Sequence, residues 1–534
     1  MKSIKILKYS YLVFCLWLIN LPMIGKGGLQ ASTLEDFFTN FKRVVENQDL
    51  KSISSFYDQN QTDFFKKEIN NWRNIFTSAS TKDLKIKYFS LGRNNSERFV
   101  IYDISSPDPL FNLIFSNTFT SHPYILRKIN KGWKFYGGTR LSEFYIPLEE
   151  KINVVIDPSA HKIHVTQKIK LKTVRDNIPA VVFLLSDELK VSSCSGEGRN
   201  LPFEQFGYLL RVERPLIKSE DELTLTVKYA GKVEKYKVWN EHYIYNTGGI
   251  LRSENFWHLS LSSYEEFLPR LVKLTIDLPK DFFAVSDSGR LILCKEKGAC
   301  LVQKWDVSPA DSLFLGFIFY NGWSVKTYDT GINKLILCLD KDSKLDGKKI
   351  ITPAVDIMKK YQEMFGKISV RDFYILDYNF GFKRKNYIPA DINILSHELA
   401  HLWWTFPGEL WLNEGFAEYS EALYIERSQG HSAFLQKLKS LKQEMIRNIE
   451  GGLDLPLIDS GYHNLLYNKG ALVVHALRVE LRDCVFFKTL QDLIANFTTK
   501  ILLGKTFALQ QKPFLGVILD FSLTNGYPGL VCHT

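Results

Sequence analysis

The chain has 534 residues, 45% of them hydrophobic, which is enough for about three or four domains and excludes a single small binding module. Its 24% of charged residues, 32 Gly and 18 Pro are typical of globular proteins and exclude long disorder, collagen and a bundle of membrane helices. The formal net charge is +10, and the excess of lysine is scattered along a sequence without a nucleic-acid-binding motif. We therefore predict a solvated basic surface and no nucleic acid as a partner.

The N-terminus has the layout of a secretory signal. Lys2, Lys5 and Lys8 precede an uncharged apolar run at 9–25, and the small residues of GKGGLQAS follow. This order is typical of a segment that is removed on export. Because such a run could barely cross a bilayer at about 1.5 Å per residue, an uncleaved anchor stays open as the alternative. We expect a signal peptide or anchor over 1–30 and an exported protein that is periplasmic, extracellular or tethered facing outward.

From 31 to 143 the sequence predicts a small α+β domain. Phe38, Phe41, Val44 and Val45 recur at helical spacing, a second helical stretch covers TDFFKKEINNWRNIF, and strand-like runs follow. Helices followed by an antiparallel sheet are typical of an α+β layer. The order resembles the cystatin-like, nuclear-transport-factor-like cone fold. Because no polar cluster converges in this stretch, we expect an interaction or spacer domain.

From 144 to 325 the pattern changes to period two. KINVVIDPSAHKIHVTQKIKLK predicts a strand, a turn at Asp157–Ser159 and a returning strand, and further runs extend this into an all-β, saddle-like domain. Cys294 and Cys300 flank KEKGA between two strand-like runs, so we expect them across the neck of a hairpin. A disulfide between them and two unpaired buried thiols both stay open.

The pentapeptide HELAH at 397–401 carries candidate catalytic chemistry. On a helix, residues i and i+4 lie one above the other, so His397 and His401 can bind one zinc ion at about 2.0–2.1 Å. Glu398 points beside the metal, where it can hold a water. Zinc lowers the pKa of that water towards 7, and the carboxylate takes its proton as the water attacks a carbonyl.

A catalytic zinc needs a third protein ligand, and the next helical stretch, WLNEGFAE at 411–418, offers a carboxylate after a short reversal. HELAH followed by WLNEGFAEY resembles the aminopeptidase N-like (gluzincin) zinc metallopeptidases. The resemblance covers about 144–520 and implies a thermolysin-like, mainly helical catalytic domain over 326–534. It also implies one Zn²⁺ per chain, held by His397, His401 and Glu414, with Glu398 as the general base.

Two further residues are candidates for the same site. Glu418 lies one turn after Glu414 and is a candidate acceptor for the N–H of a ligand histidine, with a solvated helix glutamate as the alternative. Tyr467 in LYNKGALVVHALR matches the family's Tyr-x-Lys-Gly segment. The resemblance implies that its phenol hydrogen-bonds the oxyanion of the tetrahedral intermediate.

The segment before HELAH departs from the family. Family aminopeptidases carry Gly-x-Met-Glu-Asn there, whose glutamate pairs with the substrate's α-amine, whereas this chain has GFKRKN at 381–386. Cations repel a protonated amine, which argues against the usual recognition of the peptide N-terminus. Asp377 and Asp391 are candidate replacements for the missing carboxylate. One hypothesis is an anionic substrate group bound by this segment, with an exposed basic loop as the alternative; its substrate-binding candidates are Gly381, Lys383, Arg384 and Lys385.

The sequence thus predicts a multidomain α+β protein with a signal segment, a small cone domain, an all-β domain and a helical zinc domain. The expected function is that of an exported, aminopeptidase-like zinc metallopeptidase, which hydrolyses peptide bonds of a peptide or protein substrate. Two alternatives stay open. One is an exported peptide- or protein-binding scaffold with a weak or inactive site, and the other is an endopeptidase on the same zinc site.

Overall fold

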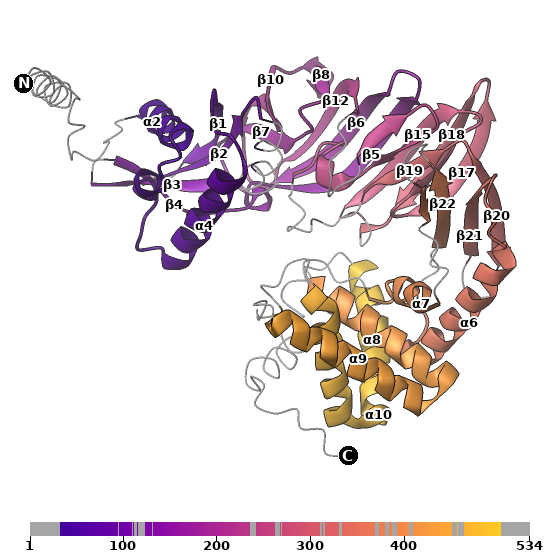
Figure 1. The fold of residues 1–534 in the computed structure, drawn as a ribbon. Helices are drawn as coiled ribbons and strands as arrows, with labels where there is room; N and C mark the ends of the chain where they lie inside the picture. The colour runs from indigo at the N-terminus through magenta and orange to yellow at the C-terminus, as the bar shows by residue number, and fades with distance from the viewer. Residues whose placement is uncertain are drawn as a thin grey trace, which may run out of the picture. The chain divides into compact units, whose positions relative to one another are not determined.

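The computed structural model describes residues 33–502, except residue 131 and short stretches within 94–95, 109–122, 235–241, 262–269, 310–314, 330–333, 369–372, 380–383, 387–391, 405–409 and 451–463. The contacts of the chain divide it into two compact units, 1–139 and 140–534 (Figure 1). The further division expected between 325 and 326 stays a prediction. The predicted signal segment over 1–30 lies outside the described residues. Among the helices that are described, none is long and apolar enough to span a membrane.

Unit 1 places helices before an antiparallel sheet, as its sequence predicts. Its helices are α2 (Leu34–Glu46), α3 (Leu50–Ser54) and α4 (Thr62–Ser78), and its sheet has the order β1 (Lys85–Arg93), β2 (Glu97–Ser105), β3 (Tyr124–Ile129) and β4 (Gly132–Gly138). Thr33 and Asp36 form a capping box at the start of α2. The amphipathic face of α2 buries Phe37, Phe38 and Phe41 in an aromatic core. The cystatin-like fold stays a prediction.

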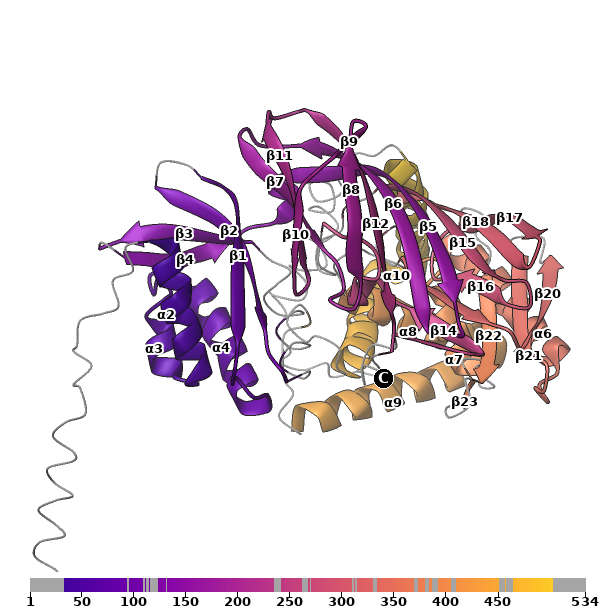
Figure 2. The ribbon, with the colours of Figure 1, turned by 90° about the horizontal axis from the view of Figure 1, so that it is seen from above.

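Unit 2 begins with strands whose alternating residues form the core. Its largest sheet has the order β17 (Arg290–Lys297), β18 (Cys300–Val307), β15 (Leu271–Pro279), β5 (Tyr145–Asp157), β6 (Lys162–Thr173), β12 (Glu222–Lys232), β8 (Lys190–Gly196) and β9 (Arg199–Asn200). Figure 2 shows these strands side by side in a twisted sheet. Along β5, buried Ile152, Val154 and Ile156 alternate with exposed residues, as period two requires.

Two smaller sheets complete this β region. One has the order β10 (Phe203–Phe206), β11 (Leu209–Ile217) and β7 (Ile178–Leu184), and the other has the order β13 (Tyr243–Tyr245), β14 (Gly248–Leu251), β19 (Phe317–Tyr320) and β16 (Phe283–Ser286). Short 3₁₀ helices lie at η2 (Leu141–Glu143) and η3 (Ser253–Asn255).

The predicted hairpin around KEKGA exists, but the disulfide does not. Strands β17 and β18 pair so that Cys294 faces Gln303 and Cys300 faces Lys297. Cys294 therefore lies three residues, or ~10 Å, along β17 from the partner of Cys300, which is too far for a disulfide. Both are free thiols, and Cys294 is exposed. The disulfide alternative is wrong.

The chain then forms a fourth sheet of unit 2 and a layer of helices. The sheet has the order β20 (Trp323–Asp329), β21 (Lys334–Asp340), β22 (Phe373–Asn379) and β23 (Arg384–Asn386). The helices are α6 (Gly347–Phe365), α7 (Ile392–Ala400), α8 (Leu410–Gln429), α9 (His431–Glu450) and α10 (Asn464–Leu502). Leu337 and Ile375 of the sheet share a hydrophobic core with Leu399, Trp404 and Phe416 of the helical region. This core fixes the helices that carry the candidate ligands.

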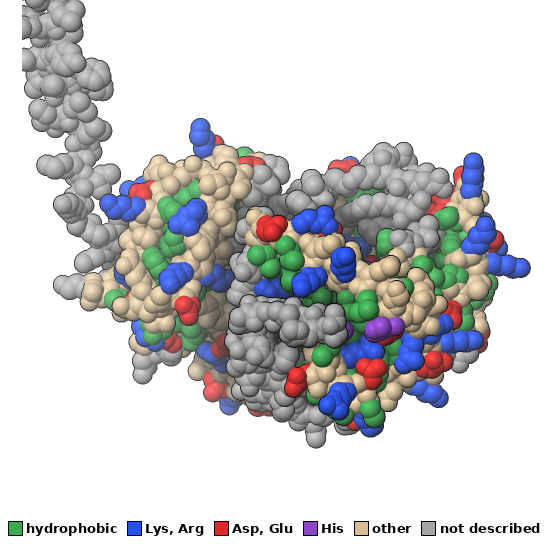
Figure 3. Space-filling view, turned by 60° about the horizontal axis from the view of Figure 1, so that its bottom comes forward, with side chains coloured by type: hydrophobic (Ala, Val, Ile, Leu, Met, Phe, Trp, Pro, Cys, Tyr) green, Lys and Arg blue, Asp and Glu red, His purple; other side chains and the backbone are tan. Residues whose placement is uncertain are grey.

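The basic charge of the chain is spread over its surface. On the face drawn in Figure 3, lysine and arginine side chains are scattered among acidic and apolar ones. Several lysines of unit 2 are paired with glutamates, including Lys151 with Glu149 and Lys170 with Glu222. Exposed pairs of this kind contribute little to stability. The visible surface therefore agrees with the predicted solvated basic surface.

Candidate metal centre

Three elements carry the candidate site residues. His397 and Glu398 lie on α7, and His401 lies in the turn directly after its last residue, Ala400. Glu414 lies near the start of α8. Of the three residues between the two histidines, Leu399 and Ala400 are fully buried, whereas Glu398 is exposed. Packing of this apolar pair in the core turns the histidines together towards α8.

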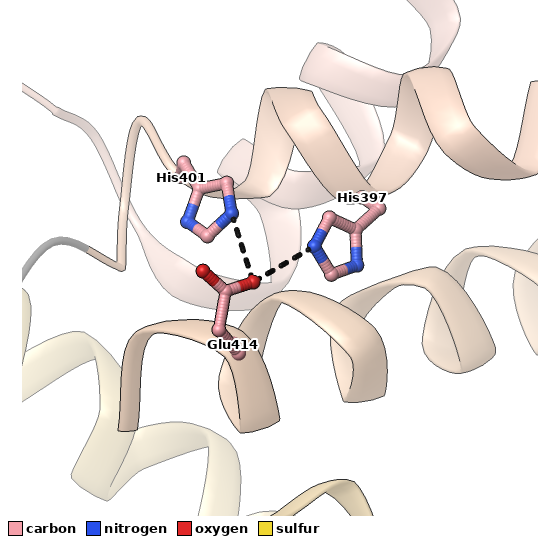
Figure 4. Close-up of side chains that lie close together, drawn as sticks. All are labelled: His397, His401 and Glu414. Carbon is pink, nitrogen blue, oxygen red and sulfur yellow. Dashed lines mark hydrogen bonds and ion pairs between the residues drawn. The ribbon is translucent and has the colours of Figure 1, made fainter. Parts of the chain in front are cut away.

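The side chains of His397, His401 and Glu414 meet at one point (Figure 4). His397 Nε2 lies 3.3 Å and His401 Nε2 3.6 Å from Glu414 Oε2. One ligand atom from each of the three residues lies within 4.8 Å of the others. Two imidazole nitrogens and one carboxylate oxygen are a donor set that suits zinc and leaves one position for a reactant. The residues present therefore fit the metal that the sequence predicts.

The second nitrogen of each histidine has its own acceptor. His397 Nδ1 lies 3.2 Å from Glu418 Oε2, and His401 Nδ1 lies 3.2 Å from the carbonyl oxygen of Trp404. The ionised carboxylate of Glu418 and the carbonyl oxygen of Trp404 have no proton to donate. Each Nδ1 therefore carries the proton and donates the hydrogen bond. With Nδ1 as the donor, Nε2 is the nitrogen of each histidine that would bind a metal, once zinc has displaced any proton from it.

The electrostatics of the site favour a positive charge at this point. Burial lowers the pKa of His397, but hydrogen bonds to Glu414 and Glu418 outweigh burial and raise this pKa to about 10. Burial raises the pKa of Glu414, but hydrogen bonds to the two histidines outweigh it and lower this pKa to about 2. The carboxylates thus stay ionised and stabilise a cation between the helices.

Two charged residues behind the histidines were not found by sequence reasoning. Lys437 of α9 places Nζ 2.7 Å from Glu418 Oε1 and 2.5 Å from Glu421 Oε1. Glu421 follows Glu418 by three residues on α8, so helical spacing offered a signal for this carboxylate pair. Lys437 belongs to a separate helix, and no spacing in the sequence connects it with the site.

Tyr467 of α10 lies beside the site because α10 packs closely against α8. Its ring centroid lies 5.7 Å from that of His397. Gly415 of α8 and Gly470 of α10 lie back to back, because a Cβ atom on either would lie 2.9 Å from backbone atoms of the other. Any larger residue would hold the helices apart. Gly415 directly follows Glu414, and Gly470 lies three positions after Tyr467. Sequence reasoning missed the packing role of both glycines.

The basic segment is described only in part. Gly381 and Lys383 lie outside the described residues, and so does Asp391. For Arg384 and Lys385 only the backbone is described: β23 pairs with β22, with Lys385 opposite Tyr378. Asp377 of β22 is fully buried, and its carboxylate oxygens have no hydrogen-bond partner in the described structure. Binding of a substrate group by the segment 381–386 therefore stays a prediction.

Comparisons with known proteins show which family model and which solved structures this chain is similar to. Residues 363–510 match the Peptidase family M1 domain. The fold is similar to that of an M1 zinc metallopeptidase from Deinococcus radiodurans, with a TM-score of 0.55 and 15% identity, covering 72% of this chain and 94% of that chain. It is equally similar to an alanine variant of an M1 zinc metallopeptidase from the same organism bound to a Tyr-Ser-Ala substrate, with a TM-score of 0.55 and 16% identity over 73% and 99% of the chains.

A further similar structure is a two-domain M1 zinc metallopeptidase variant bound to L-tryptophan, with a TM-score of 0.53 and 16% identity over 72% and 95% of the chains. No curated protein matches. At these identities the solved structures show the fold: a multidomain α+β protein with β-sheet N-terminal domains and a helical C-terminal region.

Proposed function

We propose that this chain, whose residues 363–510 match the Peptidase family M1 domain, is a zinc-dependent hydrolase that cleaves peptide bonds in peptide substrates. The observation that carries the proposal is the convergence of His397, His401 and Glu414 on one point. The substrate-bound M1 structure, which holds Tyr-Ser-Ala, supports peptides as the substrate class.

Each residue has a distinct role in the proposed reaction. His397 Nε2, His401 Nε2 and the Glu414 carboxylate would hold a zinc ion. Zinc supplies Lewis-acid polarisation of the scissile carbonyl and lowers the pKa of an attacking water. Glu398 takes the proton from that water and returns it to the leaving amine. Tyr467 donates a hydrogen bond to the carbonyl oxygen as negative charge develops on it.

We propose an aminopeptidase-like specificity that does not use the family's usual glutamate. The stretch 381–386 contains three cations and no carboxylate, so another group must receive the substrate amine. An endopeptidase is the competing proposal, because the same zinc chemistry works on internal bonds. N-acetylated peptides separate the two, since an aminopeptidase rejects them and an endopeptidase cleaves them.

A binding scaffold with an inactive site is the third possibility. A site without catalytic function would tolerate loss of its reactive groups, whereas this chain retains the three metal-binding side chains, Glu398 and Tyr467. We therefore place the enzyme first. The basic and apolar layout of 1–30 supports export of this enzyme, with a retained anchor as the alternative.

The test combines zinc content with cleavage of a peptide library. We expect about one zinc per purified chain. Glu398→Ala should retain zinc and lose about 10²–10⁴-fold in kcat, because it removes the proton acceptor and no ligand.

The control is Glu480→Ala, which removes an exposed glutamate of α10 outside the site and should match the wild type. A wild-type protein without zinc, or equal activity of the wild type and Glu398→Ala, would refute the proposal.

A further inference from the structure

Lys437 lies behind the metal centre and has none of the roles assigned above. Its ammonium group contacts the Oε1 atoms of both Glu418 and Glu421, at 2.7 and 2.5 Å. The cluster is largely buried, since Glu421 is only 5% exposed and the Lys437 side chain is 20% exposed. Burying a cation and two carboxylates is costly unless they contact one another, so this cluster is built around its mutual contacts.

The cluster has the composition of a second metal site. His397, Glu418 and Glu421 offer three ligand atoms within 4.8 Å of one another. Lys437 Nζ, however, already contacts both carboxylates at hydrogen-bond distance. Its positive charge offsets the repulsion between two carboxylates that lie three residues apart on one helix. This position in the fold therefore carries a permanent cation from the protein itself.

Glu418 connects this cation to the candidate zinc ligand. Its Oε1 atom contacts Lys437, and its Oε2 atom lies 3.2 Å from His397 Nδ1. Because each oxygen has a different partner, rotation of the carboxylate would break one contact or both. The contact with Lys437 thus fixes the direction in which Glu418 accepts from His397. The direction of His397 Nε2 towards Glu414 follows from it.

We propose that Lys437 is a positioning residue for the zinc site, which holds Glu418 so that it orients His397 and thereby tightens zinc binding. This inference rests on the proposed function, because it assumes that His397 is a zinc ligand. Two effects oppose each other when the ammonium is removed. The loss of repulsion between Lys437 and the metal strengthens zinc binding. The second effect weakens zinc binding, because Glu418 and Glu421 then repel each other and Glu418 loses its orientation. Loss of such outer contacts typically weakens metal binding about 10–100-fold, so we expect the second effect to win.

The experiment measures zinc affinity by chelator competition on the full chain. We expect Lys437→Met to bind zinc about 10–100-fold more weakly than the wild type, with kcat at saturating zinc within about 3-fold. Lys437→Arg keeps the positive charge and can contact both carboxylates, so it should restore most of the affinity. The matched control is Lys439→Met, which removes the same charge from an exposed position of α9 and should leave zinc affinity unchanged.

A double-mutant cycle tests whether Lys437 acts through Glu418. In a Glu418→Gln background, Lys437→Met should have no further effect on zinc affinity. Equal or tighter zinc binding by Lys437→Met, or full additivity with Glu418→Gln, overturns the inference. If Lys437→Met does not fold, Lys437→Gln replaces it and should also weaken zinc binding, because a neutral amide does not offset the repulsion between the two carboxylates. A wild-type protein that binds no zinc contradicts the proposed function instead, so the two failures are distinct.

Discussion

Side-chain direction at the metal centre is set by the atoms that do not face the metal. His397 is held through Nδ1 by a side chain, Glu418, whereas His401 is held through Nδ1 by a backbone carbonyl, that of Trp404. A backbone acceptor cannot be removed by substitution, but a carboxylate can rotate. The His397 side of the site therefore depends on further contacts of Glu418, and the His401 side does not.

Tyr467→Phe tests the proposed oxyanion contact at the scale of a single atom. The substitution removes the phenol oxygen and keeps the ring beside His397. We expect kcat to fall about 10²–10³-fold, the cost of losing one oxyanion donor, while zinc content stays unchanged. Steady-state kinetics and metal analysis measure both.

Tyr424→Phe is the matched control for this variant. Tyr424 lies on α8, and its hydroxyl donates to Asp356 of α6. Its loss should leave kcat unchanged. A kcat for Tyr467→Phe equal to that of Tyr424→Phe would contradict a catalytic role for the phenol.

At the scale of elements, the site depends on how closely α8 and α10 approach. Glu414 and Tyr467 come from different helices, and Gly415 and Gly470 set the separation of those helices. Helix axes normally lie about 8–10 Å apart, with side chains setting the distance, and two facing glycines allow a closer approach. The glycines thus bring a catalytic candidate of α10 beside the ligands of α7 and α8.

Gly470→Ala should therefore destabilise the protein although alanine favours helices. The new Cβ would lie 2.9 Å from the Cα of Gly415, so the backbones must separate. Overpacking typically costs about 1–3 kcal/mol, which exceeds the gain of about 1 kcal/mol in helix propensity. Denaturant unfolding should show the loss of stability, and kcat should fall because Tyr467 moves with α10.

Gly138→Ala is the control for the glycine contact. A Cβ at Gly138, the last residue of β4, would meet no atom within 4 Å, and this position is exposed. This variant should keep wild-type stability and kcat. Greater stability of Gly470→Ala than of the wild type would show that the helices do not need the close approach.

At the scale of the whole molecule, the two compact units have different sensitivities. Unit 2 contains the metal centre. Unit 1 contains a buried carboxyl group, that of Glu68. Its Oε2 atom accepts hydrogen bonds from the hydroxyl groups of Tyr57 and Tyr124, each at 3.4 Å. Burial raises the pKa of Glu68 to about 7. Zinc binding should therefore stabilise unit 2, and protonation of Glu68 should stabilise unit 1.

Calorimetry of the full chain should resolve these two responses. The Glu68 carboxyl binds its proton more tightly in folded unit 1, at a pKa of about 7, than in the unfolded chain, at about 4.5. Its stabilisation is therefore complete below about pH 4.5 and is lost as the pH rises through about 7, a change of about 3 kcal/mol. Raising the pH from 5 to 8 should lower the unfolding temperature of unit 1, and a zinc chelator should lower only that of unit 2.

Glu68→Gln is the control for the pH response, because an amide does not titrate. Its unit 1 transition should lack the part of the pH dependence that Glu68 causes. A chelator that shifts both transitions equally would contradict independent unfolding of the units.

The sequence by itself determined the residues that meet at the metal centre and the order of the structural classes. HELAH brings two imidazoles to the same side of α7 and the turn that follows it, and WLNEGFAE brings a carboxylate on the next helix. These are local spacings that backbone geometry converts directly into position. The alternation along β5 and β6 likewise predicted a hairpin of long strands, because period two decides which face is buried.

Only the tertiary structure decided the features that join distant elements. The contact of Lys437 with Glu418, the crossing at Gly415 and Gly470, and the register that separates Cys294 from Cys300 are each set by packing between segments. No spacing within one segment encodes such a contact, because it depends on where two faces meet after the core has formed. The sequence therefore named the candidate ligands, and the packed helices decided what holds them in place.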